Sequence, residues 1–313
     1  MSSQIITDEQ LAPSRPRGGV CANSTLLSDY WALTKPEINF LILITTFVGF
    51  YLGCGRENAP FPFHTLVSAL LGTLLVASGT GTLNQYIERK FDAQMRRTAR
   101  RPAATGRLKP AAVLAFGIVL SVAGSTYLAV AVNLLASGLA VLTLLSYLFV
   151  YTPLKRRTPL CVLAGAFPGA MPPLIGWAAA SGGLKKEAWV LYAILFFWQF
   201  PHFMAIAWMY REDYDRAGYL VLPQGAARVP FVILQTLLPL LALIIIGVMQ
   251  AVVWPAALLY CASVLIGVGF LYFGFRFVIQ RSRVAARRLL LASIAYVPLW
   301  FVLSATLCNP VSR

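Results

Sequence analysis

Long apolar blocks dominate the chain, and shorter polar segments separate them. Each block spans about 17 to 22 residues, the length that crosses roughly 30 Å of hydrocarbon as a helix. The blocks begin near residues 38, 65, 111, 134, 160, 189, 230, 256 and 289. Because a helix satisfies its own backbone in lipid, the pattern predicts an all-α polytopic membrane protein with nine transmembrane helices.

Glycine and proline interrupt two of these blocks. The interruptions are Gly165, Pro168, Gly169, Pro172 and Pro173 in the fifth block and Pro201 in the sixth. In lipid, such breaks persist only where neighbouring protein or a cavity satisfies the freed backbone groups. We therefore expect the helices to surround a central cavity.

Polar segments at the two ends of the chain frame the apolar blocks. The first 30 residues mix acids, arginines and prolines, without the charged, apolar and small-residue order of a secretory signal. We expect a solvated tail over residues 1–30, a single transmembrane domain over 31–307 and a short tail over 308–313.

Composition and charge support a membrane protein and set its orientation. The 313 residues are 58% hydrophobic and 12% charged, whereas soluble domains are roughly 45–50% apolar and about 25% charged. The net charge of +15 would favour a nucleic-acid partner in a soluble chain. Here 22 of the 26 Lys and Arg residues lie on the side that holds the N-terminus. The positive-inside rule then predicts a cytoplasmic N-terminus and an external C-terminus. We expect the lipid bilayer, and no nucleic acid, as the partner of these cations.

A first acidic motif ends the second apolar block. Asn84, Glu88 and Asp92 follow one another at i, i+4 and i+8, which places them on one face of a helix. Two carboxylates and an amide oxygen at a membrane boundary are hard ligands that suit Mg²⁺. A solvated helix face also alternates in charge, so the spacing alone leaves that interpretation open.

Cations surround this motif. They are Arg89, Lys90, Arg96, Arg97, Arg100, Arg101, Arg107 and Lys109. A diphosphate requires such a setting, because a metal neutralises its bridging oxygens while guanidinium groups bind the terminal ones. The sequence has no P-loop, and its two histidines are too few for a histidine-rich metal centre. We predict a site for a diphosphate leaving group.

A second acidic segment follows the sixth block and contains Glu212, Asp213 and Asp215. On a continuous helix Asp213 faces inward with Tyr210 and is adjacent to Tyr214. Five of the eleven acids lie in the two acidic segments. Two carboxylate clusters at one depth indicate two metal sites bridged by one polyanion.

A histidine lies deeper in the sixth block. His202 precedes Asp213 by 11 residues, so on a continuous helix the two share a face about 16 Å apart. An ionisable side chain in a membrane helix indicates function by default, but a histidine bonded to a neighbouring helix is also common. Both interpretations stay open, and one form of the first is an imidazole that binds haem iron.

Three motifs together resemble a known family. The segment Asn84-x3-Glu88-x3-Asp92-x2-Met95-x-Arg97-Thr98-x2-Arg101-Pro102 resembles the first motif of the UbiA-type intramembrane prenyltransferases. Pro201-His202-Phe203 and Asp213-Tyr214-x2-Ala217-Gly218-x3-Leu222-Pro223 are similar to the branch that farnesylates haem. The resemblance covers roughly residues 30 to 305. Many family members carry a second acid four residues from the one that matches Asp213. This chain has Met209 and Ala217 there, a reduced form typical of that branch.

The resemblance implies a transferase that joins the farnesyl group of farnesyl diphosphate to a vinyl group of haem B and releases diphosphate. It implies that Mg²⁺ is held by Asn84, Glu88, Asp92 and Asp213, that diphosphate oxygens are bound by Arg97, Arg101 and Lys155, that Tyr214 belongs to the catalytic set and that His202 binds haem. Tyr147, Tyr151, Trp208 or Tyr214 would face the allylic cation. The resemblance also implies a bacterial inner-membrane protein that makes haem O for haem–copper oxidases. Such a protein would contact other haem-synthesis or oxidase-assembly proteins.

Two rival functions are compatible with parts of the pattern. A UbiA-type enzyme with an aromatic or quinone-precursor acceptor would share both acidic motifs and differ around His202 and Trp177. A secondary transporter for an anion would place its site near the bilayer midplane. The acids lie at the inner helix ends instead, which argues against transport.

Overall fold

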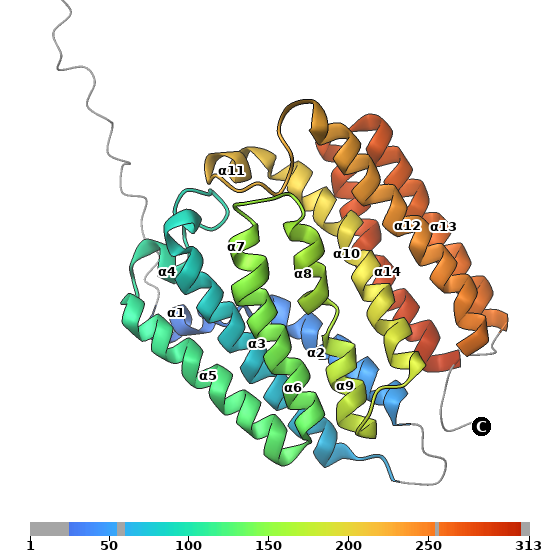
Figure 1. Ribbon diagram of the computed structural model, residues 1–313, viewed down its shortest axis with the longest axis horizontal. Coiled ribbons are helices and arrows are strands. Elements are labelled where there is room, and N and C mark those ends of the chain that lie inside the picture. The colour runs from blue at the N-terminus through green and yellow to red at the C-terminus, as the bar shows by residue number, and fades with distance from the viewer. Residues whose placement is uncertain (1–24, 55–59, 254–256, 308–313) are drawn as a thin grey trace, which may run out of the picture.

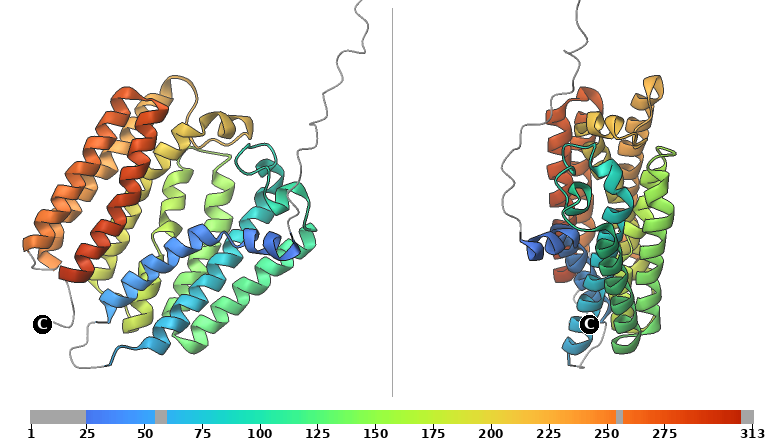
Figure 2. Two further views of the ribbon diagram at one scale, coloured as in Figure 1. Left: turned by 180° about the vertical axis from the view of Figure 1, so that it is seen from behind. Right: turned by 90° about the vertical axis from the view of Figure 1, so that its left-hand side faces the viewer.

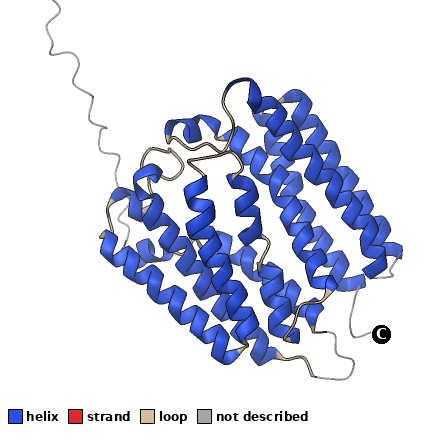
Figure 3. Ribbon diagram, in the orientation of Figure 1, coloured by secondary structure: helices blue, strands red, loops and turns tan. Residues whose placement is uncertain are grey.

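The computed structural model describes residues 25–54, 60–253 and 257–307, and over these residues it contains helices and loops only (Figures 1 and 3). The helices are α1 (Leu26–Leu33), α2 (Pro36–Gly53), α3 (Phe63–Asp92), α4 (Pro102–Thr105), α5 (Pro110–Ala131), α6 (Leu134–Leu145), α7 (Thr152–Leu154), α8 (Cys161–Gly169), α9 (Pro172–Ser181), α10 (Lys186–Met209), α11 (Arg211–Arg216), α12 (Arg228–Val253), α13 (Ala257–Gln280) and α14 (Arg283–Leu307). A π-helical segment, Ser146–Tyr151, joins α6 to α7.

Nine helical segments of the described chain are long and apolar enough to cross a membrane, as the sequence predicts. They are Pro36–Gly53, Phe63–Asp92, Pro110–Ala131, Leu134–Leu154, Cys161–Ser181, Lys186–Met209, Gly225–Met249, Ala257–Gln280 and Arg283–Leu307. The outer face of the bundle exposes many large apolar side chains, among them Phe40, Phe149 and Leu265. An integral membrane protein follows, because water would not tolerate so large an apolar surface.

The spans lie side by side in one bundle whose loops gather at its two ends (Figures 1 and 2). Helix α3 packs along α5, α2 packs along α9, and α10 lies between α12 and α14. The short helices α4 and α11 lie at the same end of the bundle, α11 at the top of Figure 1 and α4 lower, at the left. This end carries both acidic motifs.

The fifth span breaks where its glycines and prolines predict a break. Helix α8 ends at Gly169 and α9 begins at Pro172, with Pro168 inside the last turn of α8. Helix α9 is buried almost throughout and crosses α2 closely, since a Cβ atom at Gly176 would overlap the backbone of Thr46. Pro201 behaves differently, because α10 continues through it.

The described part of the expected solvated tail, residues 25–30, belongs to a helix and its N-cap. Helix α1 starts at Leu26 with Thr25 as its N-cap, and Asp29 on it is buried and pairs with Arg107 at 3.0 Å. The helix forms because Leu33 packs into a small apolar cluster beside α4 and α5. Residues 1–24 and the expected tail 308–313 lie outside the described residues.

Candidate active site

Helix α3 presents the first acidic motif on one face at its C-terminal end, as the spacing predicts. Asn84, Glu88 and Asp92 are all buried, and the helix ends at Asp92. Buried carboxylates are stable only when other groups compensate their charge. The identity of those groups therefore defines the site.

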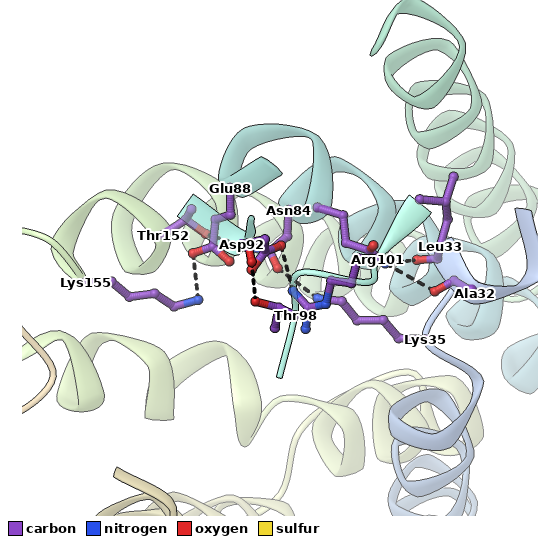
Figure 4. A network of polar contacts seen from close by, with 11 residues as sticks. Ala32, Leu33, Lys35, Asn84, Glu88, Asp92, Thr98, Arg101, Thr152 and Lys155 are labelled. Atoms are coloured by element: carbon purple, nitrogen blue, oxygen red, sulfur yellow. Dashed lines mark hydrogen bonds and ion pairs between the residues drawn. The ribbon is translucent and has the colours of Figure 1, made fainter. Parts of the chain in front are cut away.

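Each of the three side chains meets a cation from a different part of the chain (Figure 4). Lys35 Nζ lies 2.8 Å from Asn84 Oδ1. Lys155 Nζ lies 2.8 Å from Glu88 Oε1, and Arg101 Nη1 lies 2.8 Å from Asp92 Oδ2. When Lys35 is protonated, three positive and two negative charges share one partly buried row, with an excess of positive charge that suits an anion.

The loop after α3 turns back so that Arg101 reaches Asp92. Thr98 Oγ1 donates to the Asp92 carbonyl at 2.9 Å, and the Arg101 amide donates to the Thr98 carbonyl at 3.0 Å. Pro102 then begins α4 at a position where a missing N–H costs nothing. Arg101, which the sequence assigns to the diphosphate, is therefore held by its own backbone beside the acid motif.

Two partly buried lysines complete the row, and the pKa values of their ammonium groups shift in opposite directions. Burial, followed by the nearby charge of Arg101, lowers the pKa of Lys35 to about 7. Burial also disfavours the charged form of Lys155, but the negative charge of Glu88 helps to raise its pKa well above the usual value. The difference arises because Lys155 faces a carboxylate, whereas the bonded partner of Lys35 is a neutral amide.

The π-helical segment supplies aromatic rings next to this row. Tyr147 and Tyr151 lie with ring centroids 5.1 Å apart, and Lys155 Nζ lies 4.5 Å from the centre of the Tyr151 ring. A π-helical turn is often found at functional sites. Trp208, in contrast, donates to the Arg281 carbonyl at 2.9 Å and packs on Phe277, so it faces α13 and the α13–α14 loop.

Helix α10 ends before the second acidic motif, which corrects the expected continuous helix. The chain leaves helical geometry at Tyr210 and resumes in the separate helix α11 (Figure 1). His202 and Asp213 therefore do not share one helix face, and the expected 16 Å rise between them does not apply. No glycine or proline marks this break in the sequence.

The acids of α11 pair with nearby arginines. Asp213 lies 3.2 Å from Arg216, and its side chain is 14% exposed. Glu212 is 64% exposed and lies 3.3 Å from Arg283. Among the described residues no three His, Cys, Asp or Glu side chains lie close enough together to hold a metal ion. The two motifs thus do not form one compact acidic cluster.

The segment after α11 nevertheless contacts the first motif. The Leu220 amide donates to the Lys155 carbonyl at 2.7 Å, and the Tyr219 ring lies 6.1 Å from that of Phe91. Tyr214 packs on Tyr219 at 6.2 Å. The exposed Arg97 lies over the Tyr210 ring at 5.5 Å, so it joins the two motifs without reaching the acids of α3.

Two buried polar atoms at this site have no hydrogen-bond partner among the described residues. They are Asp92 Oδ1 and the Tyr219 hydroxyl. Burial raises the pKa of Tyr219, and the charge of Glu88 adds to that effect. A carboxylate oxygen without a partner, next to Glu88 and Asn84, is a donor set that fits Mg²⁺. Tyr219 could not be predicted as a site residue, because it carries no signal in the sequence beyond its position in a polar loop.

A cavity of about 380 Å³ lies beside the row. Its walls are Ile87, Glu88, Phe91, Thr152, Pro153, Arg156, Arg157 and Tyr219. Arg156 also lies 4.2 Å from the centre of the Phe91 ring. The lining of the cavity therefore combines apolar side chains with two arginines, as a molecule with an anionic head and a hydrocarbon tail requires.

His202 lies apart from these residues. Its Nδ1 atom is 2.8 Å from Ser293 Oγ on α14, and its ring stacks on Trp198 with centroids 4.7 Å apart. The interhelical hydrogen bond fits the structural interpretation of a membrane histidine. It does not exclude the functional one, because a second ring nitrogen remains.

Known proteins resemble this chain in sequence and in fold. The model of the UbiA prenyltransferase family matches residues 42–302. A protoheme IX farnesyltransferase from Solibacter usitatus is 46% identical, with 87% of this chain and 96% of the relative covered. A protein of the same name from Koribacter versatilis is 42% identical over 91% and 94% of the two chains.

Solved structures share the arrangement of helices at low sequence identity. A digeranylgeranylglyceryl phosphate synthase superposes with a TM-score of 0.70 at 14% identity, over 92% of this chain and 99% of the other. A UbiA homologue from Archaeoglobus fulgidus, bound to GPP and Mg²⁺, superposes with a TM-score of 0.60 at 13% identity, over 88% and 99%. At these identities the likeness concerns the fold.

Proposed function

The chain belongs to the UbiA prenyltransferase family, and from that premise we propose that it transfers the farnesyl group of farnesyl diphosphate to a vinyl group of haem B. The products are haem O and diphosphate. The names of the relatives at 46% and 42% identity support haem as acceptor. The observation that carries the reaction type is the buried row in which Lys35, Lys155 and Arg101 face the polar side chains of α3.

The three cations bind the diphosphate group. Each lies within hydrogen-bond distance of a side chain on α3, so each can exchange that partner for a phosphate oxygen without a large movement. Negative charge grows on the diphosphate as the farnesyl C–O bond breaks. Cations already in place stabilise that charge without reorganisation, and such stabilisation supplies much of the rate enhancement in many enzymes. Arg97 extends the cationic surface towards α11.

Mg²⁺ fits the donors of α3, namely Asn84, Glu88 and Asp92, of which Asp92 has an oxygen without a partner. When bound, the ion neutralises phosphate charge. Asp213 is the acid of α11 best placed to add a ligand, because it is the least exposed of the three there. Tyr214, the next residue, packs on Tyr219, which keeps this loop against the first motif.

Aromatic rings stabilise the farnesyl cation. Tyr147 and Tyr151 lie beside Lys155, and each ring face contributes roughly 0.5 to 2 kcal/mol to a nearby cation. The haem vinyl carbon attacks the farnesyl carbon, and water adds to the new cation. His202 binds the haem, as argued below.

The membrane setting follows the charge distribution. The protein is an integral membrane protein, and we assign it to the bacterial cytoplasmic membrane with the acidic motifs on the cytoplasmic side. The N-terminus would lie in the cytoplasm and the C-terminus outside, because 22 of 26 cations fall on one side. Other haem-synthesis or oxidase-assembly proteins would be its neighbours.

A direct assay tests the proposed function. Purified protein in vesicles receives haem B, farnesyl diphosphate and Mg²⁺, and mass spectrometry follows the haem. We expect a heavier, more hydrophobic haem that requires all three components. A parallel reaction replaces haem with an aromatic quinone precursor. Prenylation of that acceptor, with haem unchanged, would establish the rival acceptor class instead.

A further inference from the structure

The contact between His202 and Ser293 determines which imidazole nitrogen carries the proton. Ser293 Oγ lies 2.6 Å from the Leu290 carbonyl oxygen and 2.8 Å from His202 Nδ1. A carbonyl oxygen only accepts hydrogen bonds, so the single hydroxyl hydrogen points to Leu290. The reverse arrangement would bring two oxygen lone pairs together at 2.6 Å. Ser293 therefore accepts from His202, and a neutral His202 carries its hydrogen on Nδ1.

Ser293 also fixes the plane of the ring. Its backbone carbonyl accepts from Trp198 Nε1 at 2.7 Å, and the Trp198 ring stacks on His202 with an interplanar angle of 30°. Ser293 is fully buried, so no water competes for either bond. One residue of α14 thus anchors two rings of α10, one through its backbone and one through its hydroxyl.

The second ring nitrogen, Nε2, is left with a bare lone pair. It has no hydrogen-bond partner among the described residues, and His202 is only partly buried. His202 precedes the end of α10 by seven residues, about 10 Å along the axis. It therefore lies within the membrane, below the end that carries the diphosphate site.

Metal-binding histidines have this arrangement: one nitrogen donates to a fixed acceptor while the other binds the metal. We propose that Ser293 is a positioning residue that holds His202 in the Nδ1–H form, so that Nε2 binds the iron of haem B. The iron-binding half rests on the proposed function. The tautomer half does not, because it follows from the protein alone.

Nitrogen-15 NMR of histidine-labelled protein in lipid nanodiscs tests the tautomer. The chain has two histidines, so His64→Gln leaves His202 as the single signal. We expect a protonated Nδ1 and an unprotonated Nε2, and a changed ratio in Ser293→Ala. A protonated Nε2 in the otherwise intact protein would overturn the proposal. That measurement needs no Ser293 variant, so it decides the question even if Ser293→Ala fails to fold.

Ser304→Ala is the matched control. Ser304 lies on the same helix, is equally buried and donates to the carbonyl of residue 300 at 2.9 Å. It differs from Ser293 in having no described side-chain bond to another helix. We expect Ser304→Ala to leave the His202 spectrum unchanged. An equal change in both variants would mean that any loss of a buried hydroxyl disturbs the ring, and would overturn the specific role of Ser293.

Haem binding tests the iron half. Haem B is titrated into the protein, and resonance Raman spectra of the ferrous complex report the iron–imidazole stretch. We expect His202→Ala to abolish that stretch, and Ser293→Ala to shift it and weaken affinity about tenfold. An unchanged stretch in His202→Ala, in a protein that still farnesylates haem, would overturn the iron role and leave the proposed function standing. Absence of farnesyl transfer in the intact protein would instead contradict the proposed function.

Discussion

The two acidic motifs lie at the same end of the bundle but hold their charges in different ways. At the end of α3, Glu88 and Asp92 are buried, and their cationic partners come from loops outside that helix. On α11, Glu212 and Asp213 retain more contact with water, and Asp213 pairs with an arginine one turn away. The cations that meet Glu88 and Asp92 come from outside α3, whereas Asp213 has its partner on its own helix and the pair of Glu212 with Arg283 is exposed to water.

Burial explains why this difference matters for function. An exposed ion pair gains little, because water screens both charges. A buried carboxylate is costly unless its partner is present, so its surroundings are fixed by the fold and its field is strong. We therefore expect the first motif to dominate both stability and catalysis. Substitutions in the two motifs test whether the first has the larger effect on stability and turnover.

The largest expected effect is the loss of a buried cation. Lys155→Met leaves Glu88 buried without its partner, which should lower the free energy of unfolding by about 3–5 kcal/mol. Arg216→Ala removes the partner of Asp213 and should cost no more than about 1 kcal/mol, because Arg216 is 44% exposed. Unfolding in mixed micelles measures both.

The double variant Lys155→Met/Glu88→Gln separates charge from packing. If Lys155→Met loses stability because the Glu88 carboxylate is left uncompensated, neutralising Glu88 should restore a large part of that stability. Equal costs for Lys155→Met and Arg216→Ala would contradict the contrast between the motifs.

Removal of a buried acid should have the next largest effect, on turnover. Asp92→Asn keeps the size of the side chain but weakens its hold on Arg101 and on a metal ion. We expect kcat to fall about 100- to 1000-fold, comparable to the loss of one strong electrostatic contact in other enzymes. The rate of haem farnesylation, with thermal unfolding as a check on folding, measures this. Near-normal turnover would remove Asp92 from the site.

Within the second motif, the loss of activity on neutralising an acid should be larger for the less exposed side chain. Asp213→Asn should lower kcat/KM by about tenfold to a hundredfold, equivalent to roughly 1.4–2.7 kcal/mol. Glu212→Gln, at a side chain 64% exposed, should change it less than about twofold. A titration with Mg²⁺ tells whether Asp213 acts through the metal, since the midpoint should then rise in Asp213→Asn alone. Equal effects of the two substitutions would remove the distinction.

The same contrast shows how much the sequence could predict. The nine spans and the shared face of Asn84, Glu88 and Asp92 could be predicted, because both depend on local periodicity. The pairing of Asn84 with Lys35 and of Glu88 with Lys155 could not be predicted, since these lysines are distant in sequence from their partners. Sequence spacing also could not place Arg97, which lies over an aromatic ring instead of beside the acids.

Two further features of the site could not be predicted from the sequence. The break at Tyr210 lacks a glycine or proline, so periodicity alone predicts that α10 continues. Tyr219 enters the site because the Leu220 amide, in the loop after α11, bonds to the Lys155 carbonyl 65 residues earlier in the chain, and such a contact leaves no local pattern.

The smallest expected effect concerns pH and the one lysine of the row whose bonded partner is neutral. Since the pKa of Lys35 is about 7, its charge is present below that pH and lost above it. Lys35→Arg stays charged throughout. The ratio of kcat/KM for the unmodified protein to that of Lys35→Arg should therefore fall about threefold to tenfold between about pH 6 and 8.5.

The ratio isolates Lys35 because ionisation of the diphosphate affects both proteins equally, and kcat/KM reports groups of the free enzyme. Lys155, whose pKa is raised, should contribute no step in this range. A ratio that is flat with pH would mean that Lys35 keeps its proton. The carboxylates of Glu88 and Asp92 would then outweigh burial at this position, and the two buried lysines would act alike.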